Sequence, residues 1–68
     1  MKFLGKKIKL RRIELEMNQA DLAEKCEIAT STISGIEKHS NMPNLKILLK
    51  LKKVLKVPLD FFFEEVTK

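Results

Sequence analysis

Apolar residues recur every three or four positions along this chain, and no stretch alternates polar and apolar residues long enough to predict a strand. In the first segment, Ile8, Arg12 and Leu15 fall on one face of a helix expected over residues 4–15. A chain of 68 residues has room for only one modest core. We therefore predict an all-α fold, in a single domain that covers residues 1–68.

Turn and capping residues divide the chain into five expected helices, over residues 4–15, 19–25, 30–38, 45–56 and 59–65. Asn18 and Asn44 are favourable N-caps, and Asp21 can complete a capping box with Asn18. Pro43 disfavours helical geometry in the residue before it, and Pro58 suits the first turn of the last helix. The inward positions are predicted to be Leu22, Ala23, Cys26, Ile33, Ile36, Leu48, Leu51, Val54 and Leu55.

The most informative stretch is residues 18–38, which predicts two short helices joined by a tight turn. Ala23 lies where these helices would cross, and a small side chain there permits the close, steep packing of a helix-turn-helix. The second helix then turns Ile33 and Ile36 inward. Its outward residues are Thr30, Ser31, Ser34, Gly35 and Lys38. A face with short, uncharged side chains between basic segments suits the major groove of DNA, because phosphates attract the flanks while base edges meet the helix front.

Basic residues outnumber acidic ones by 14 to 9, which gives a net charge of +5. They crowd residues 2–12 and 46–56. This distribution favours a polyanionic partner, although runs of charge also serve simply to solvate helix faces. Adhesion to a membrane surface is a third reading, but it needs an exposed apolar helix face, and here those faces are required for the core.

Composition excludes several classes of protein. With one cysteine, Cys26, and one histidine, His39, the chain can form neither an internal disulfide nor a zinc tetrahedron, so we expect no metal, cofactor or small-molecule ligand. No Gly-rich phosphate loop and no nucleophile with a base is present, so we do not expect an enzyme. The apolar runs are too short for a membrane span or a secretory signal, which predicts a cytoplasmic location. Cys26 could be a redox switch, but its place on an apolar helix face favours a structural role.

The sequence resembles the phage-repressor and Cro-type helix-turn-helix domains, also called XRE-type regulators, over roughly residues 4–63. The matching segments are Ile8 and Arg12, NQADLAEK at 18–25, TSTISGIEK at 30–38, Pro43, LLKLKKVLKV at 48–57 and LDFFF at 59–63. The resemblance implies a compact five-helix, lambda-repressor-like domain with its helix-turn-helix at about residues 19–38. It also implies a prokaryotic or phage-encoded regulator, expected to be a repressor, that binds double-stranded operator DNA as a homodimer. The alternative is an antitoxin or anti-repressor-like module whose main partner is another protein.

The resemblance also implies roles for individual residues. The positions that face the bases are Thr30, Ser31, Ser34 and Gly35. The positions that meet the phosphate backbone are Gln19, Lys38, Ser40, Asn41 and Asn44. Independently of the family, the free amides and the dipole at the helix N-terminus beside Gln19 favour an anion. Gly35 offers no side chain to a base, so it marks either a close approach of the backbone to DNA or a small spacer.

Arg12 lies between Ile8 and Leu15 on the core-facing side of its helix, so we expect its guanidinium to be partly buried. The family pattern pairs it with Glu37 in a structural ion pair, and the alternative is a contact from Arg12 to phosphate.

Three positions depart from the family pattern. Glu27 and His39 stand where glycine is usual, and both are expected to need positive φ. Ala29 leaves the recognition helix with a weak cap unless Thr30 takes over that role.

The three consecutive phenylalanines cannot all face one small core, because neighbouring residues on a helix point about 100° apart. In the family pattern Leu59, Phe62 and Phe63 match inward positions, which leaves Phe61 exposed. Beside Leu59 and Val66, Phe61 would complete a self-complementary apolar patch at a dimer interface. The alternative is a disordered tail, or an aromatic ring folded back over the core.

Overall fold

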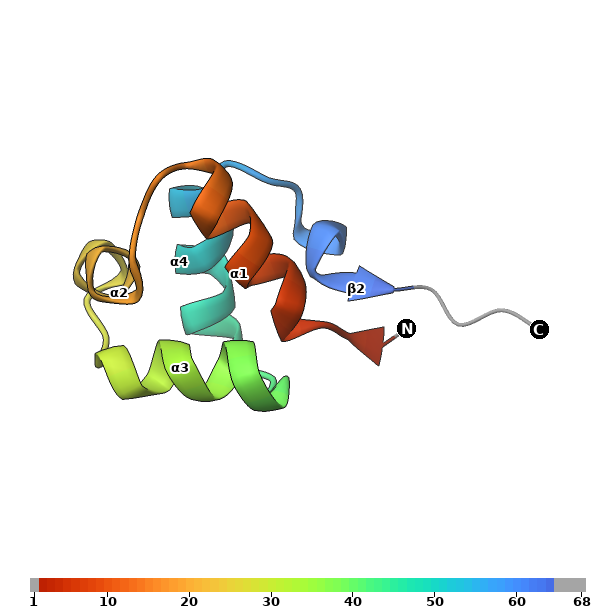
Figure 1. Ribbon diagram of the computed structural model, residues 1–68. Helices are drawn as coiled ribbons and strands as arrows, with labels where there is room; N and C mark the ends of the chain where they lie inside the picture. The colour runs from red at the N-terminus through yellow and green to blue at the C-terminus, as the bar shows by residue number, and fades with distance from the viewer. Residues whose placement is uncertain (1, 65–68) are drawn as a thin grey trace.

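The computed structural model describes residues 2–64 and shows four α-helices around one core, with a short strand at each end (Figure 1). In chain order the elements are β1 (Lys2–Phe3), α1 (Gly5–Glu14), α2 (Gln19–Cys26), α3 (Thr30–His39), α4 (Leu45–Leu55), a 3₁₀ turn η1 (Leu59–Phe62) and β2 (Phe63–Glu64). The all-α fold predicted from the apolar spacing is confirmed. Within residues 2–64, no helix has the length and apolarity needed to cross a membrane.

The C-terminal segment differs from the expected fifth helix. Over the described residues 59–64, a single 3₁₀ turn η1 forms and the chain then extends into β2, which pairs antiparallel with β1 so that Phe3 lies opposite Phe63. The amide of Leu4 also donates to the Phe62 carbonyl at 2.8 Å. The predictions of a helix over residues 59–65 and of no strand are therefore wrong, because the N-terminal segment supplies this backbone with hydrogen-bond partners that a longer helix would have provided itself.

The helix ends follow local sequence signals. The Asn18 side chain accepts a hydrogen bond from the Asp21 amide at 2.7 Å, and the Asp21 carboxylate accepts one from the Asn18 amide at 3.1 Å, which confirms the capping box at α2. Asn44 caps α4 by accepting from the Ile47 amide at 2.9 Å. Glu27 ends α2 with a φ of 60°, as its position in the tight turn predicts.

The positive φ expected at His39 is found one residue later. α3 continues through His39, and Ser40 adopts the left-handed conformation with a φ of 53°. The Ser40 hydroxyl oxygen accepts a hydrogen bond from the Gly5 amide at 3.1 Å. This contact with α1 stabilises the left-handed conformation at Ser40. The prediction for His39 is wrong because a partner distant in sequence decides where α3 ends.

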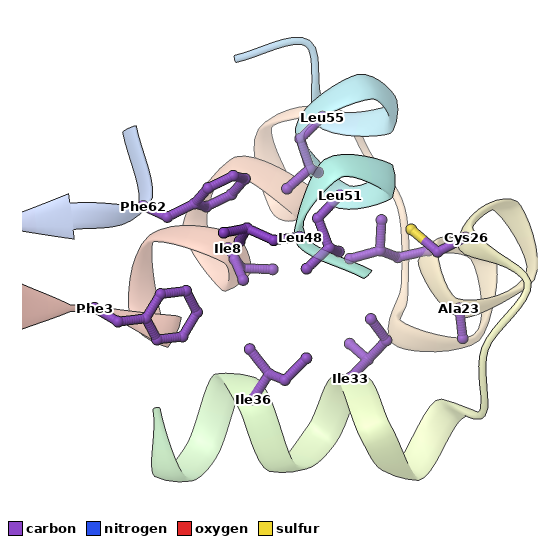
Figure 2. Packing of buried hydrophobic residues seen from close by; sticks show 11 residues of the cluster. Phe3, Ile8, Ala23, Cys26, Ile33, Ile36, Leu48, Leu51, Leu55 and Phe62 are labelled. Carbon is purple, nitrogen blue, oxygen red and sulfur yellow. The ribbon is translucent and has the colours of Figure 1, made fainter. Parts of the chain in front are cut away.

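The core lies between the four helices and the paired ends of the chain (Figure 2). Ile33 and Ile36 point from α3 toward Ile8 on α1, while Leu48, Leu51 and Leu55 on α4 close the other side. Two phenylalanines complete the cluster, namely Phe3 from β1 and Phe62 from η1. The inward positions predicted from helical spacing are buried except Val54, which is half-buried at the edge of the cluster.

Cys26 lies fully within this core on α2. Burial raises the pKa of its thiol above the ordinary value, and the positive charge of Lys50 only partly offsets that effect. The reactive form of a cysteine is the thiolate, which burial disfavours here. The structure therefore favours the packing role over the redox alternative.

Gly5 fixes how closely α1 approaches the end of α3. A Cβ atom at this position would overlap the carbonyl oxygen of Ile36, and it would also lie 2.8 Å from the Ile36 carbonyl carbon. Backbone atoms cannot move aside as a flexible side chain can. Residue 5 must therefore be glycine for the two helices to meet in this way.

Candidate nucleic-acid interface

α2 and α3 form a helix-turn-helix in which the small residue predicted at the crossing is buried. Ala23 on α2 is 2% exposed, and Ile33 on the inner face of α3 is fully buried. The turn between the helices is closed by Glu27 in the left-handed conformation and by a hydrogen bond of 3.0 Å from the Ile28 amide to the Ala23 carbonyl. This packing uses the inner face of α3 and, within residues 2–64, leaves its outer face uncovered.

The outer face of α3 carries the residues predicted to meet DNA bases. Thr30 and Ser31 are exposed, whereas Ser34 and Gly35 are half-buried farther along the helix. Within residues 2–64, the side chains of Thr30, Ser31 and Ser34 form no hydrogen bond. Their hydroxyl groups can each donate and accept, so this face can bond to a surface that presents both kinds of group.

The first turn of α3 also has free backbone donors. Ala29 is the N-cap and makes no side-chain hydrogen bond, as its sequence predicts, and Thr30 does not take over as the cap. The amides at a helix N-terminus lack intrahelical partners and carry the positive end of the helix dipole. The exposed end of α3 is therefore a donor-rich tip with uncharged side chains.

A buried ion pair joins α1 to α3 behind this face. Arg12 donates from Nε to Glu37 Oε2 at 2.7 Å and from Nη2 to Glu37 Oε1 at 3.1 Å, while its Nη1 donates to the Met17 carbonyl at 2.8 Å. Residues Arg12 and Glu37 are only 8% and 9% exposed. The bidentate geometry and the third bond satisfy a guanidinium that would be costly to bury alone.

Gln19 is held by the same carboxylate. Its Nε2 donates to Glu37 Oε1 at 3.1 Å, which fixes the side chain at the start of α2. An amide nitrogen carries two hydrogens, so the second hydrogen and the free backbone amide beside it remain available to an anion. The structure thus connects Arg12, through Glu37, to the predicted phosphate-binding residue.

A cleft of about 330 Å³ opens beside Gln19. It is lined by Gln19, Glu37, Ser34, Lys38 and Lys9. The two lysines bring positive charge from α1 and α3 to the same opening, where a phosphate group would be attracted. Lys9 is missing from the residues predicted for this site, although it lies three positions before Arg12 and therefore next to it on the helix surface, which is the signal that could have found it.

The loop after α3 provides the remaining predicted residues. Ser40, Asn41 and Asn44 are all exposed. The oxygens of Ser40 and Asn44 accept hydrogen bonds from Gly5 and Ile47, which leaves their hydroxyl and amide hydrogens for other partners. The side-chain nitrogen of Asn41, Nδ2, lies 3.4 Å from the place where a Cβ of residue 35 would be. The loop therefore begins directly beside the outer face of α3.

The predicted dimer patch differs from expectation. Phe61 is half-buried against the core, in edge-to-face contact with Phe62 at 5.7 Å between ring centroids, and Lys7 Nζ lies 5.7 Å from its ring centroid. The prediction of an exposed Phe61 is wrong, because a 3₁₀ turn directs side chains differently from an α-helix and folds the ring over the core. Leu59 is 39% exposed. Val66 lies outside the described residues.

Four helices that present a helix-turn-helix from α2 and α3, with the outer face of α3 free, define a class of small nucleic-acid-binding domains. The sequence pattern of the helix-turn-helix family matches residues 8–62, and the chain belongs to this family. The resemblance to phage-repressor and Cro-type domains is confirmed.

Two proteins of similar sequence are HTH-type transcriptional regulators, described as uncharacterised, from Sinorhizobium medicae and Rhizobium meliloti. Each is 37% identical to this chain over 62 residues, which is 91% of this chain and 45% of the relative. The chain therefore spans less than half the length of these relatives.

Two solved structures share the fold. The P22 c2 repressor, in complex with a synthetic operator, is 30% identical and superposes with a TM-score of 0.85 over 94% of this chain and 97% of that chain. The N-terminal DNA-binding domain of SinR from Bacillus subtilis is 33% identical, with a TM-score of 0.79 over 90% of this chain and 91% of that one.

Proposed function

We propose that residues 1–68 form one domain that binds double-stranded DNA, and that the protein is a transcriptional regulator acting as a repressor. The observation that carries the proposal is the outer face of α3, whose exposed hydroxyl groups have no partner among residues 2–64 and whose basic neighbours flank it on two helices. The similar proteins, described as HTH-type transcriptional regulators and as a repressor in complex with an operator, support the same assignment. DNA in a prokaryotic cell lies in the cytoplasm, which is where such a regulator acts.

In this proposal the first half of α3 enters the major groove. Thr30, Ser31 and Ser34 read base edges through their hydroxyl groups, while Gly35 lets the helix backbone lie close to the DNA. Among the described residues, a Cβ at residue 35 would meet only the side-chain nitrogen of Asn41, at 3.4 Å, which supports the close approach over the role of a spacer inside the protein.

The phosphate contacts surround this helix. Gln19, Lys38 and Lys9 border one cleft, and Ser40, Asn41 and Asn44 lie in the loop beyond α3. Contacts to phosphate hold the protein on the duplex without reading its sequence. Gln19 is oriented for this role by Glu37, whose charge is neutralised by Arg12.

We further propose a homodimer formed through the C-terminal segment. Leu59 is 39% exposed, and this apolar side chain on the surface of the C-terminal segment supports the interface. A two-fold dimer would set two copies of α3 in successive major grooves about 34–36 Å apart. Leu59→Asp tests this interface better than a change at Phe61, because Phe61 also covers the core.

The proposal is tested by selecting bound sites from random duplex DNA and measuring affinity against salt concentration. We expect a palindromic site, and a slope of about −0.9 in log K against log salt for each phosphate contacted. Lys9→Gln should reduce that slope by about one unit, whereas Lys52→Gln, on α4 away from the cleft, is the matched control and should leave it unchanged. A protein that folds but shows no measurable duplex binding would contradict the proposal.

The dimer is tested separately by sedimentation of wild type and Leu59→Asp. We expect a dimer for wild type, and for the variant a folded monomer that retains weak binding to one half-site. A wild type that is monomeric at tens of micromolar and still binds the full palindrome as single copies would refute the dimer without affecting the DNA-binding proposal.

A further inference from the structure

A groove of about 730 Å³ lies on a side of the molecule that α3 does not form. Its walls are the connection between α1 and α2, the end of α2 and the second half of α4, and none of its described lining residues belongs to α3. In Figure 1 the last turn of α4 lies on the side of the molecule away from α3, and the α1–α2 connection runs from that side down to α2. The groove therefore stays accessible when the outer face of α3 is occupied.

The floor of this groove is apolar. Leu15, Met17 and Val54 pack against the core with one side and remain half-exposed on the other. Covering this surface with an apolar side chain displaces water and lowers the free energy of the complex.

The rim of the groove is basic. Four lysines line it, namely Lys25, Lys50, Lys53 and Lys56, together with one acidic residue, Glu27. Lys50 Nζ lies 3.5 Å from Glu27 Oε1, but the Glu27 side chain is 81% exposed, so water weakens this pair. Four positive charges and one negative charge leave the lining with a net charge of +3. The potential over the groove thus attracts anions.

We propose that this groove binds an acidic segment of a partner protein, with apolar side chains on the floor and carboxylates against the lysines. A second copy of the same groove would oppose one net charge of +3 with another, which disfavours self-association through it. A nucleic-acid backbone would bind the lysines of the rim and leave the apolar floor uncovered. The proposal requires no DNA and therefore stands or falls independently of the function proposed for α3.

The experiment uses the ¹⁵N-labelled protein and a designed peptide of Glu, Leu and Phe as probe. We expect amide chemical shifts to change at Leu15, Met17 and Val54 while those of Thr30 and Ser31 stay constant. A counterpart peptide with Lys in place of Glu should produce no change. Shifts confined to α3, or equal binding of the basic peptide, would overturn the proposal.

Variants separate a built groove from general attraction between charges. Lys25→Glu with Lys53→Glu should weaken peptide binding about tenfold, because two attractions become two repulsions. The matched control, Lys6→Glu with Lys46→Glu, changes the net charge equally outside the groove, and at about 0.15 M salt screening should keep its effect under about twofold. Equal losses from the two pairs, with both proteins shown to be folded by thermal melting, would overturn the proposal.

The contribution of the floor is tested with Val54→Thr, which keeps the shape and charge of the residue. We expect several-fold weaker peptide binding at an unchanged secondary structure. Unchanged affinity would overturn the apolar half of the proposal. Stronger shifts of the same amides with phosphatidylserine vesicles or with a short DNA duplex would instead assign the groove to another class of partner.

Discussion

The two ends of α3 are held in very different ways. At the C-terminal end, Ile36 is buried, Glu37 is paired with Arg12, and Gly5 of α1 lies against the Ile36 carbonyl. At the N-terminal end, Thr30 and Ser31 are exposed, and the N-cap residue makes no side-chain hydrogen bond. We call the first the anchored end and the second, where the side chains of Thr30 and Ser31 project into solvent, the projecting end.

This difference separates stability from recognition along a single helix. The ion pair of Glu37 and the close approach of Gly5 hold the C-terminal end of α3 against α1, so a change at either residue should destabilise the whole fold. Side chains at the projecting end contact little else, so a change there should alter what the helix binds and leave the fold intact. The predictions below test this separation.

The largest effect is expected from Glu37→Ala at the anchored end. The change leaves the Arg12 guanidinium buried without its carboxylate and frees Gln19, at a cost of about 3–5 kcal/mol in unfolding free energy. Chemical denaturation of Arg12→Ala, Glu37→Ala and the double variant should show strong non-additivity. If the two effects simply add, the pair does not anchor the helix.

Gly5→Ala should destabilise the protein by about 3 kcal/mol, because a methyl group there displaces the backbone of α3. Gly35→Ala is the matched control. Over residues 2–64 its methyl group meets only Asn41 Nδ2, at 3.4 Å, so the gain in helix propensity should stabilise the protein by up to about 1 kcal/mol. Thermal melting distinguishes the two. Equal destabilisation by both would show that α3 is packed as tightly on its outer face as at its anchored end.

Ser31→Ala and Thr30→Ala at the projecting end should leave the melting temperature nearly unchanged and relax the base preference of bound DNA. Because each hydroxyl makes a single contact, we expect each variant to lose about 1 kcal/mol of discrimination against the wrong base. Gln19→Ala should instead weaken binding to all sequences alike. Site selection with each variant provides the measurement, and selected sites identical to those of wild type would remove both residues from base reading.

The smallest effect is expected from Ala29→Ser, which supplies the missing cap at the projecting end. A side-chain cap should raise the unfolding free energy by about 0.5–1 kcal/mol. Denaturation of the variant checks this, with Ala20→Ser, an exposed position within α2, as control. No gain would indicate that the first turn of α3 is already held by contacts that the cap cannot improve.

Much of the fold could be predicted from residues close together in sequence. The Asn18 and Asn44 caps depend on bonds that span three residues, and the inward positions depend on helical spacing alone. The outer face of α3 could be predicted for the same reason. Once helical spacing places Ile33 and Ile36 inward, the remaining residues of the helix lie on its outer face. Local geometry therefore determined the helices, their starts and the candidate recognition surface.

Contacts between distant residues decided the rest. Ser40 ends α3 because its hydroxyl meets the Gly5 amide, 35 positions away, and the last segment becomes a turn and a strand because β1 pairs with it. Lys9 joins the cleft of Gln19 only after α1, α2 and α3 have packed, and the four lysines meet at one groove only after α2 and α4 have packed. Sequence spacing shows which residues share one face of a helix. Which faces of different helices come into contact depends on how the side chains fill the core, and only the tertiary structure decides this.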